Sequence, residues 1–431
     1  MVSAKQSTAD TAKQITRQVL DALFSGANET VSVRLWDGSR WPDDEPRKAT
    51  LVLKHPGALR VMLLPGTEVA LGEAYLYDDI DIEGHIESVF DLAEQLTSDK
   101  LGWIDKLGIA LKLLRLPAQT SSRDTERGPA DVRGRRHSVK RDREAVTYHY
   151  DVSNDFYELW LDQRMVYSCG YFQSPDDDLD SAQQQKLDHI CRKLRLQPGQ
   201  RLLDIGCGWG SLVIHAAKHY GVDATGITLS EPQAGLANER IAQAGLSERC
   251  RVLVRDYREV SNETPYDALV SVGMFEHVGA ANLPAYFRQA YALLRPGGVF
   301  LNHGIASRAT NPPKRGPTFS DTYVFPDGEL VPINATLNAA ENASFEVRDV
   351  ESLREHYALT LRHWVSRLEA SREQAREFVD EPTYRVWRLF MSGSAHGFES
   401  GRLNIYQTLL AKPDAEGHAH LPLTRDDWYV R

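Results

Sequence analysis

Residues 202–220, LLDIGCGWGSLVIHAAKHY, decide the fold of this chain. An apolar run before the first glycine predicts a strand, and the apolar spacing after the last glycine predicts a helix. Gly206, Gly208 and Gly210 lie at the junction, where they let the backbone turn sharply and approach a ligand closely. The preceding Asp204 can reach the same loop or its ligand. The order DxGxGxG differs from the GxGxxG of a dinucleotide site, so we expect a different ligand.

Strand-like and helix-like segments alternate around this loop. Helical segments separate five predicted strands, which are residues 201–206, 223–229, 251–257, 267–273 and 299–305. Such alternation is typical of a doubly wound α/β sheet. After residue 350 the pattern becomes helical and rich in aromatic residues, which suit either a core or a substrate channel.

Two further motifs accompany the loop. Asp256 follows the strand RVLVR, and LRPGG, ending at Gly298, precedes the last predicted strand. Together with the loop, they resemble the class I methyltransferases, which bind S-adenosylmethionine. The segment GITLSEPQ has no carboxylate where many of these enzymes bind the ribose, so Thr228, Ser230 and Gln233 are candidates for those hydrogen bonds. The predicted cofactor-binding set is Tyr167, Ser168, Asp204, Gly206, Gly208, Gly210, Thr228, Leu229, Ser230, Gln233, Asp256 and Tyr257.

The first 120 residues predict a small α+β domain that precedes the catalytic domain of residues 144–431. Its hairpin turn is Asp37-Gly38. We expect helices over residues 1–24 and 88–96, and strands over residues 31–41, 49–55 and 58–64.

Residues 100–116, KLGWIDKLGIALKLLRL, combine apolar side chains with interspersed basic ones. One interpretation is a helix lying on a membrane surface. The other is a core helix whose lysines extend to solvent. Gly102 and Gly108 weaken the helical pattern in both.

The stretch 121–143 predicts a polar linker because it lacks aromatic residues and almost all aliphatic ones. Its second half is basic within an acidic protein. Those basic residues form either a solvated charge run or a site that attracts anionic lipid headgroups. They are Arg133, Arg135, Arg136, Lys140, Arg141 and Arg143.

The bulk composition excludes several classes of protein. The net charge of −10 over 431 residues is opposite to that expected of a nucleic-acid binder, so we predict no nucleic-acid partner. None of the four cysteines lies in a CxxC pair, which predicts no zinc or other metal site and fits a reducing cytoplasm. The N-terminus has no apolar signal region, and no apolar run approaches a membrane span. We therefore expect a cytoplasmic protein, peripherally associated with the inner face of the membrane.

Four motifs together resemble the cyclopropane-fatty-acyl-phospholipid synthases and the mycolic acid cyclopropane synthases. They are YHYDVSNDFYELWLDQRMVYSCGYF (148–172), LLDIGCGWGSL, GITLSEPQ and SVGMFEHVG (271–279). The resemblance covers roughly residues 144–410, whereas residues 1–120 match the phospholipid enzymes only in size and placement. It implies S-adenosylmethionine as cofactor, an unsaturated acyl chain as substrate and a phospholipid bilayer surface as partner.

The resemblance also implies a mechanism. Addition of the methyl group to a cis alkene leaves a carbocation, and the ring closes when that methyl loses a proton. Bound bicarbonate acts as the base in this account. The pocket that the resemblance assigns to it consists of Cys169, Glu276, His303, Ile305 and Tyr357. Gly304 stands where the family often has another residue.

These residue types suit that chemistry. Because an alkene is a poor nucleophile, catalysis depends on orientation, on electrostatic stabilisation of a cation and on exclusion of water. His303 and Tyr357 offer donors to an anion, and Glu276 can accept a hydrogen bond from it or orient its proton. Each also has an ordinary structural role available: Cys169 as a small buried apolar side chain, His303 as a core histidine, and Tyr357 as a packing ring.

Three alternative functions stay open at this level. The same alkene could be methylated without ring closure, which gives a methyl- or methylene-branched chain. A soluble small molecule could be the acceptor, although the N-terminal domain and the basic linker argue against it. A non-catalytic binding module would not require the intact set of pocket residues. The sequence leaves both a monomer and a homodimer open.

Overall fold

The computed structural model describes residues 2–24, 30–97, 102–123, 125, 128–130, 133–134, 137–150, 152–261, 263–311 and 316–429. The chain forms two compact units. Unit 1 contains Met1–Pro129, Arg315–Val324 and Val379–His396. Unit 2 contains Ala130–Lys314, Phe325–Phe378 and Gly397–Arg431.

Unit 2 is built around one sheet of seven strands, which are β5 (Arg201–Ile205), β6 (Asp223–Thr228), β7 (Cys250–Val254), β8 (Tyr266–Val272), β9 (Leu294–Ser307), β10 (Glu346–Ser352) and β11 (Leu403–Ala411). Their order is β10-β11-β9-β8-β5-β6-β7. The strands from β5 to β9 pair in parallel, and β11 pairs antiparallel with both β9 and β10.

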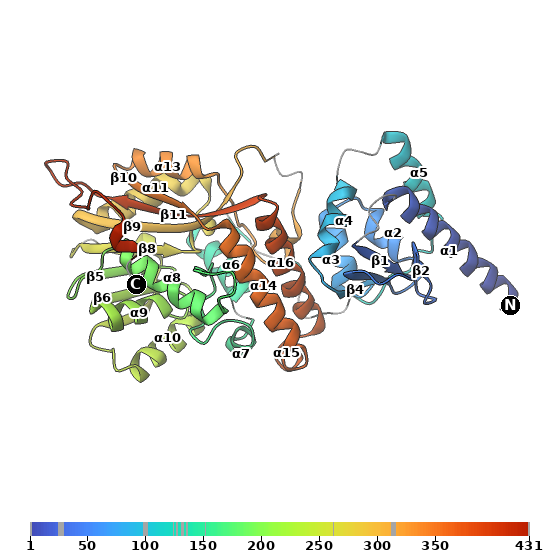
Figure 1. The fold of residues 1–431 in the computed structure, drawn as a ribbon, viewed down its shortest axis with the longest axis horizontal. Coiled ribbons are helices and arrows are strands. Elements are labelled where there is room, and N and C mark those ends of the chain that lie inside the picture. Colours follow the sequence, from blue (N-terminus) through green and yellow to red (C-terminus); the bar gives the residue numbers. More distant parts are fainter. Residues whose placement is uncertain are drawn as a thin grey trace. The chain divides into compact units, whose positions relative to one another are not determined.

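Helices cover both faces of this sheet (Figure 1). Leu202 packs in one core cluster with residues of α8 and α9, whereas its neighbour Leu203 packs in another with residues of α11. Successive side chains of a strand point to opposite faces, so both faces of the sheet are buried around its central strands β5 and β8. The helices of unit 2 are α6 (Val139–Tyr150), α7 (Asn154–Glu158), α8 (Leu179–Lys193), α9 (Ser211–Tyr220), α10 (Glu231–Gln243), α11 (Leu283–Leu293), α13 (Ile333–Asn342), α14 (Arg354–Ala370) and α15 (Arg372–Phe378), with short 3-10 turns η1 (Tyr257–Glu259), η2 (Phe275–His277), η3 (Ala280–Asn282) and η4 (Asp426–Trp428).

This arrangement confirms the predicted class I methyltransferase-like fold, and the five predicted strands correspond to β5 through β9. The helical region expected after residue 350 is confirmed by α14, α15 and α16 (Glu381–Glu399), but β11 also lies there and was not predicted. β11 is a strand because it pairs along its whole length with β9 and also with β10. A short apolar run does not by itself distinguish a strand from a helix.

Unit 1 contains a smaller sheet of order β2-β1-β3-β4. Residues 58–64, predicted as a strand, instead form a helix from Ala58 to Leu63, because Ala58, Leu59 and Met62 bury one helical face. The elements of unit 1 are β1 (Val31–Arg34), β2 (Arg40–Trp41), β3 (Ala49–Leu53), β4 (Ile80–Gly84), α1 (Val2–Phe24), α2 (Ala58–Leu63), α3 (Glu68–Leu76), α4 (Ser88–Thr97), α5 (Trp103–Leu114), α12 (Phe319–Tyr323) and most of α16 (Glu381–Glu399).

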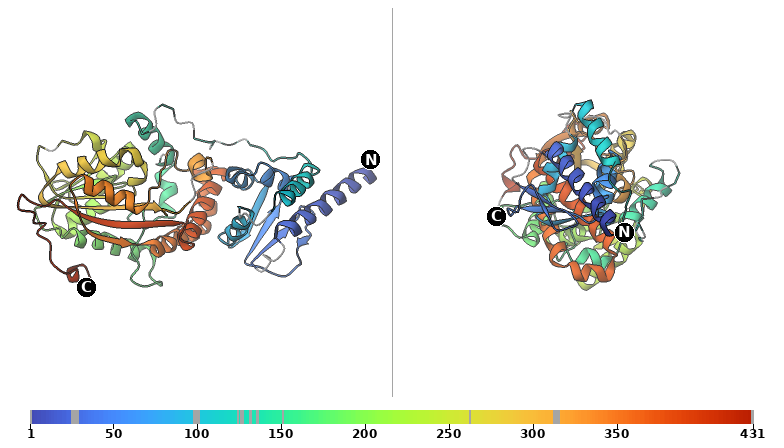
Figure 2. Two further views of the ribbon diagram at one scale, coloured as in Figure 1. Left: turned by 90° about the horizontal axis from the view of Figure 1, so that it is seen from above. Right: turned by 90° about the vertical axis from the view of Figure 1, so that its right-hand side faces the viewer.

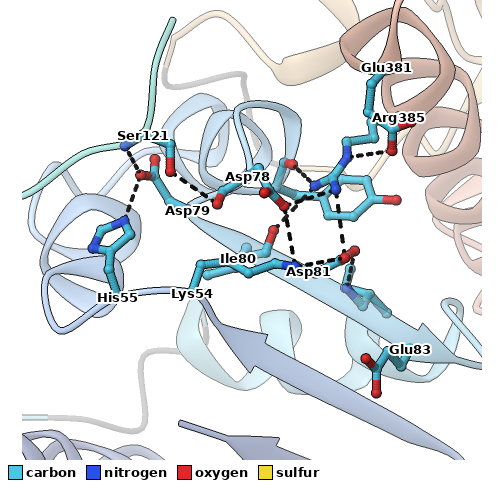
Figure 3. Close-up of polar contacts among 12 residues, drawn as sticks. Lys54, His55, Asp78, Asp79, Ile80, Asp81, Glu83, Ser121, Glu381 and Arg385 are labelled. Atoms are coloured by element: carbon cyan, nitrogen blue, oxygen red, sulfur yellow. Dashed lines mark hydrogen bonds and ion pairs between the residues drawn. The ribbon is translucent and has the colours of Figure 1, made fainter. Parts of the chain in front are cut away.

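An ionic network explains why residues 379–396 belong to unit 1 rather than to the predicted catalytic segment (Figure 3). The guanidinium of Arg385, in α16, donates to the carbonyl of Tyr75 at 2.7 Å and to Oδ1 of Asp78 at 2.9 Å. Arg385 is nearly fully buried, so these bonds to unit 1 compensate the desolvation of its charge. The division of the chain therefore does not follow sequence order.

A buried pair in the same region holds the start of the linker. His55 Nε2 lies 2.8 Å from Oδ1 of Asp79, and the backbone N–H of Ser121 donates to that oxygen at 2.6 Å (Figure 3).

Within the described ranges, no helix is both long and apolar enough to cross a membrane.

Candidate active site

The glycine loop between β5 and α9 has the backbone that the sequence predicts. Gly206, Gly208 and Gly210 have φ values of +84°, +52° and +78°, a region that side chains disfavour. A Cβ added at Gly206 would lie 2.6 Å from the Cβ of Met274. The N–H groups of Gly206 and Cys207 both donate to the carbonyl of Ile227, at 2.9 and 3.0 Å, which fixes the loop to β6.

A cavity lies at the carboxyl ends of β5, β6 and β8, where ligands bind in open α/β sheets. All the predicted cofactor residues except Gly210 and Ser230 line it. Gly210 is instead the N-cap of α9. Ser230 is the N-cap of α10, and its hydroxyl accepts a hydrogen bond from the backbone N–H of Gln233 at 3.3 Å. These two residues therefore shape the loops around the cavity without facing it.

Asp204 is the buried carboxyl group of this cavity. Burial raises its pKa to about 7, and the nearby ammonium of Lys186 opposes that rise. Its Oδ1 atom is buried without a hydrogen-bond partner among the described residues. Buried polar atoms are normally paired, so this oxygen suits a donor from a bound ligand.

Lys186 is a cavity residue that the sequence analysis missed. Its Nζ atom, on α8, donates to the hydroxyl oxygen of Ser168 at 2.8 Å, and burial lowers its pKa to about 8. An ammonium only donates, so Ser168 must accept this bond and can direct its own proton to another acceptor. Both residues line the cavity. The pair therefore presents an oriented hydroxyl donor beside a positive charge.

Asp256 lines the cavity, but its carboxylate is held by the protein itself. Oδ1 accepts from the backbone N–H and Nε of Arg258, at 2.9 and 2.8 Å, and Oδ2 accepts from a terminal nitrogen of the same guanidinium at 2.6 Å. That nitrogen also donates to Asp142 of α6 at 2.9 Å. Arg258 therefore links Asp142, in the first turn of α6, to Asp256, which follows β7.

The hydroxyl of Thr228 donates to the side-chain carbonyl of Gln233 at 2.8 Å. This bond leaves the amide NH2 of Gln233 as a donor at the cavity wall. Of the three residues predicted to replace the ribose carboxylate, Gln233 is therefore the one that offers donors to the cavity, because Ser230 does not line it and the Thr228 proton is used within the loop.

Glu276 lies in η2, shortly after β8, and its sequence neighbours Met274 and His277 line the cavity. Its Oε1 accepts a hydrogen bond from the backbone N–H of Ile305 at 2.7 Å. Oε2 is buried with no hydrogen-bond partner among the described residues. Burial raises the pKa of this carboxyl to about 7. The group is thus poised between its two protonation states near neutral pH.

His303 lies two residues before Ile305 in β9, so both side chains point to the same face of the strand. Nδ1 of His303 is 3.3 Å from the amide nitrogen of Gln407 in β11. Burial lowers the pKa of His303 well below its ordinary range, so the ring is neutral. With the Gln407 amide donating to Nδ1, the proton lies on Nε2, a buried atom without a partner in the described part of the chain.

Gly304 separates these two residues, and the space beside it is filled. A Cβ added there would lie 2.9 Å from the ring of Phe275. The glycine therefore permits Phe275 to pack against β9 and so supports the neighbouring Glu276.

The remaining predicted pocket residues meet at Leu353. Its carbonyl accepts from the backbone N–H of Tyr357 at 3.1 Å and lies 3.7 Å from Sγ of Cys169. Its own N–H donates to the carbonyl of Ile405, which pairs with Ile305 across the sheet. Backbone contacts through β11 thus link Ile305 in β9 to Leu353, beside which Cys169 and Tyr357 lie.

Cys169 and Tyr357 also have packing roles. The Cys169 thiol is fully buried, and burial raises its pKa, so it is unsuited to act as a nucleophile. The ring of Tyr357 lies 4.7 Å from the ring centroid of Phe398 and 6.0 Å from that of Trp364.

The basic linker is partly used within unit 2. A terminal nitrogen of Arg141 donates to Oδ1 of Asp327 at 2.8 Å, and its Nε contacts the other carboxylate oxygen. Arg135 and Arg136 lie outside the described residues, as does the side chain of Lys140.

Comparison with known proteins places this geometry in a family. The mycolic acid cyclopropane synthetase family matches residues 137–408, which is more than half of the chain. The chain belongs to this family. A second match, to a domain of unknown function, covers residues 16–101.

Relatives and solved structures agree with the family. A probable fatty acid methyltransferase of Pseudomonas putida is 41% identical over 400 residues, covering 92% of this chain and 95% of that protein. The cyclopropane-fatty-acyl-phospholipid synthase of Escherichia coli strain K12 is 35% identical over 264 residues, covering 61% of this chain and 66% of that enzyme. Mycolic acid cyclopropane synthase CmaA1, solved with SAH and CTAB, has a TM-score of 0.59 and 35% identity, covering 62% of this chain and 97% of that structure. The chain is therefore an S-adenosylmethionine-dependent methyltransferase of the cyclopropane synthase type.

Several cavity residues of this family member were absent from the predicted set. They include Lys186, Trp209, Met274 and His277. The sequence around Lys186 could have indicated its burial, because Lys186 lies at helical spacing from Leu179, Ala182 and Ile190 on the buried face of α8. A lysine on an apolar stripe needs a polar partner, and here that partner is Ser168.

Proposed function

We propose that this methyltransferase adds the methyl carbon of S-adenosylmethionine to a cis double bond in an unsaturated phospholipid acyl chain and closes a cyclopropane ring, with bicarbonate as the base. One bond from sulfur to the methyl carbon breaks as a bond from that carbon to an alkene carbon forms. The second alkene carbon becomes cationic. Loss of a proton from the added methyl group then supplies the electron pair that closes the ring.

The observation that carries the proposal is the pair of unpartnered buried atoms on Glu276 and His303. Oε2 of Glu276 and Nε2 of His303 have no hydrogen-bond partner among the described residues. Bicarbonate, when bound, supplies both a hydroxyl donor and anionic acceptors as well as the base. The Glu276 carboxylate fits the hydroxyl, and the Nε2–H of His303 fits an anionic oxygen.

S-adenosylmethionine, when bound, supplies the electrophilic methyl group. The cavity residues that would hold it are the glycine loop, Asp204, Ser168 and Gln233. Oδ1 of Asp204 offers an acceptor, whereas Ser168 and Gln233 offer donors. This mixture of donors and acceptors suits the ammonium, carboxylate and hydroxyl groups of that molecule.

Unsaturated lipid vesicles and cofactor with a fully deuterated methyl group test the proposal. A cyclopropane retains two of the three deuterium atoms and resists ozone. A methylene branch also retains two but keeps a double bond that ozone cleaves. A methyl branch forms when the proton leaves a carbon of the chain instead, so it retains all three deuterium atoms and also keeps a double bond. Mass spectrometry before and after ozonolysis therefore distinguishes the products. Turnover should also fall when bicarbonate is stripped from the buffer and recover when it is added back.

A methyl- or methylene-branched product is the second candidate, because the Pseudomonas putida relative is named a probable fatty acid methyltransferase. Both candidates share the cation and differ only in how the proton leaves. If no lipid acquires label while a soluble amine does, both lipid functions are excluded.

As the proposed substrate chain lies in a bilayer, we also propose that the enzyme works at the cytoplasmic membrane surface.

A further inference from the structure

Helix α5 of unit 1 has two apolar faces. One face packs into the unit, where Ile109 and Leu113 are buried against neighbouring helices, and α5 lies beside α1 in both sets of views (Figures 1 and 2). The opposite face is exposed. Its apolar side chains and their exposed fractions are Trp103 76%, Ile104 65%, Leu107 53%, Leu111 56% and Leu114 51%.

The exposed side chains form one continuous stripe. At 100° per residue, the five positions fall within a single arc of about 100°, well separated from the buried positions. Such a stripe on one helix is more than the scattered apolar residues that every protein surface carries. The C-terminal end of the helix is fixed, because Arg60 donates to the carbonyls of Leu114 and Leu116 at 3.2 and 2.8 Å. The stripe is therefore held rigidly in place.

Basic residues border the stripe. Lys112 and Arg115 follow one edge, Lys106 lies beyond the other, and Asp105 is the single acidic residue of α5. The helix with its C-cap is thus basic within a chain whose net charge is −10. This combination of apolar stripe, basic border and terminal tryptophan matches a surface that inserts among lipid headgroups.

We propose that the exposed stripe of α5 docks the enzyme on an anionic phospholipid surface, with the helix lying in the plane of the membrane. The proposal rests on the proposed function for its physiological surface, the bilayer that contains the acyl substrate. A second copy of the chain fits less well, because a two-fold contact would bring two basic borders together. The linker is a weaker candidate than α5, because its Arg141 is already paired with Asp327.

The test uses vesicles of saturated phosphatidylglycerol or saturated phosphatidylcholine, which contain no double bond and so measure docking apart from chemistry. We expect the full-length protein to float with the anionic vesicles and less with the neutral ones. The double variant Leu107→Gln, Leu111→Gln should lower the partition coefficient at least about tenfold, because two exposed apolar side chains no longer insert. Leu423→Gln is the matched control, since Leu423 is a fully exposed leucine outside the stripe.

A second pair of variants separates the charge from the apolar contribution. Lys112→Gln with Arg115→Gln should weaken binding to the anionic vesicles, reduce its salt dependence and leave the neutral vesicles unaffected. Trp103→Phe should remove the fluorescence shift that vesicles produce in the wild type. All these positions are at least partly exposed in the structure, and circular dichroism checks that each variant folds.

Three results would overturn the docking proposal. They are a wild type that does not bind anionic vesicles, a leucine double variant that binds as the wild type does, and a wild-type dimer that the double variant converts to a monomer without any change in vesicle binding. Turnover on detergent-dispersed unsaturated phospholipid tests the proposed function separately. Vesicle binding without turnover contradicts the proposed function alone, and turnover without vesicle binding contradicts the docking alone.

Discussion

The backbone N–H of Ile305 donates to Oε1 of Glu276 at 2.7 Å, and this single bond leaves Oε2 of the same carboxyl buried without a partner among the described residues. The bond joins the turn after β8 to β9 and so fixes the direction of the second oxygen. Glu276 and Ile305, which are 29 positions apart in the sequence, are thereby held together.

Glu276→Gln should reduce turnover by about 100-fold or more while S-adenosylmethionine affinity stays within about threefold of wild type, because a positioned electrostatic group is lost outside the cofactor cavity. Turnover is measured with labelled cofactor, and affinity by calorimetry. Glu259→Gln is the control, since Glu259 is an exposed glutamate near the cavity. Near-normal turnover in Glu276→Gln would remove this residue from the mechanism.

Turnover at saturating cofactor should rise with pH through about 7. Burial raises the pKa of Glu276 to about 7, so its carboxylate becomes the main form only above that pH. The carboxylate is the form that accepts from both the Ile305 N–H and a bicarbonate hydroxyl. The pH profile of Glu276→Gln should lack this transition, and an identical transition in the variant would assign it to another group.

The same pKa predicts a stability effect. The pKa of about 7 in the folded state lies above the ordinary value of 4.5. Protonated Glu276 therefore makes its full contribution to the free energy of unfolding below pH 4.5, and that contribution is lost as pH rises through 7. Glu276→Gln has no such loss. Its free energy of unfolding relative to wild type should therefore improve by about 1–3 kcal/mol between pH 5 and pH 8, as measured by urea denaturation. A pH-independent difference would contradict the raised pKa.

Lys186→Met and Ser168→Ala should each weaken S-adenosylmethionine binding by about tenfold, and the double variant should bind little worse than either. Lys186 is expected to act by orienting the Ser168 hydroxyl, so the two losses should not add. Calorimetry of the four proteins completes the cycle. Lys193→Met is the control, because Lys193 is equally buried but pairs with Asp349 and Glu351. Additive losses would mean that the two side chains contribute independently.

Gly206→Val should abolish cofactor binding. The residue has φ +84°, and a Cβ there would lie 2.6 Å from Met274, so the loop must move. Gly199→Val carries a similar backbone strain at φ +82°, with no atom within 4 Å of the added Cβ, and should leave affinity unchanged. Calorimetry on folded protein compares the two. Unchanged affinity in Gly206→Val would place the cofactor elsewhere.

Sequence predicted the central sheet because strand-like and helix-like segments alternate along this part of the chain, and the strands at its centre, such as β5 and β8, are mostly apolar and buried. It also predicted most of the cavity lining, because a glycine-rich loop directly after a strand is typical of a turn whose backbone approaches a ligand. Residues 58–63 and 403–411 are apolar stretches of similar appearance, yet one is a helix and the other a strand. Only pairing with β9 and β10 makes the second a strand, and that pairing is not local.

The amino-acid sequence by itself determined the fold class and the glycine loop between β5 and α9, and the residues of the proposed bicarbonate pocket came from the resemblance to a family. The tertiary structure decided the rest, because burial and partnership arise only when distant segments meet. In the folded chain the Asp256 carboxylate accepts from Arg258, and the Ser168 hydroxyl accepts from Lys186. Arg385 bonds to residues of unit 1, and the second apolar face of α5 is exposed. Each of these outcomes depends on which side chains are buried and which polar groups they meet there. Segments distant in sequence decide both, so local sequence does not specify them.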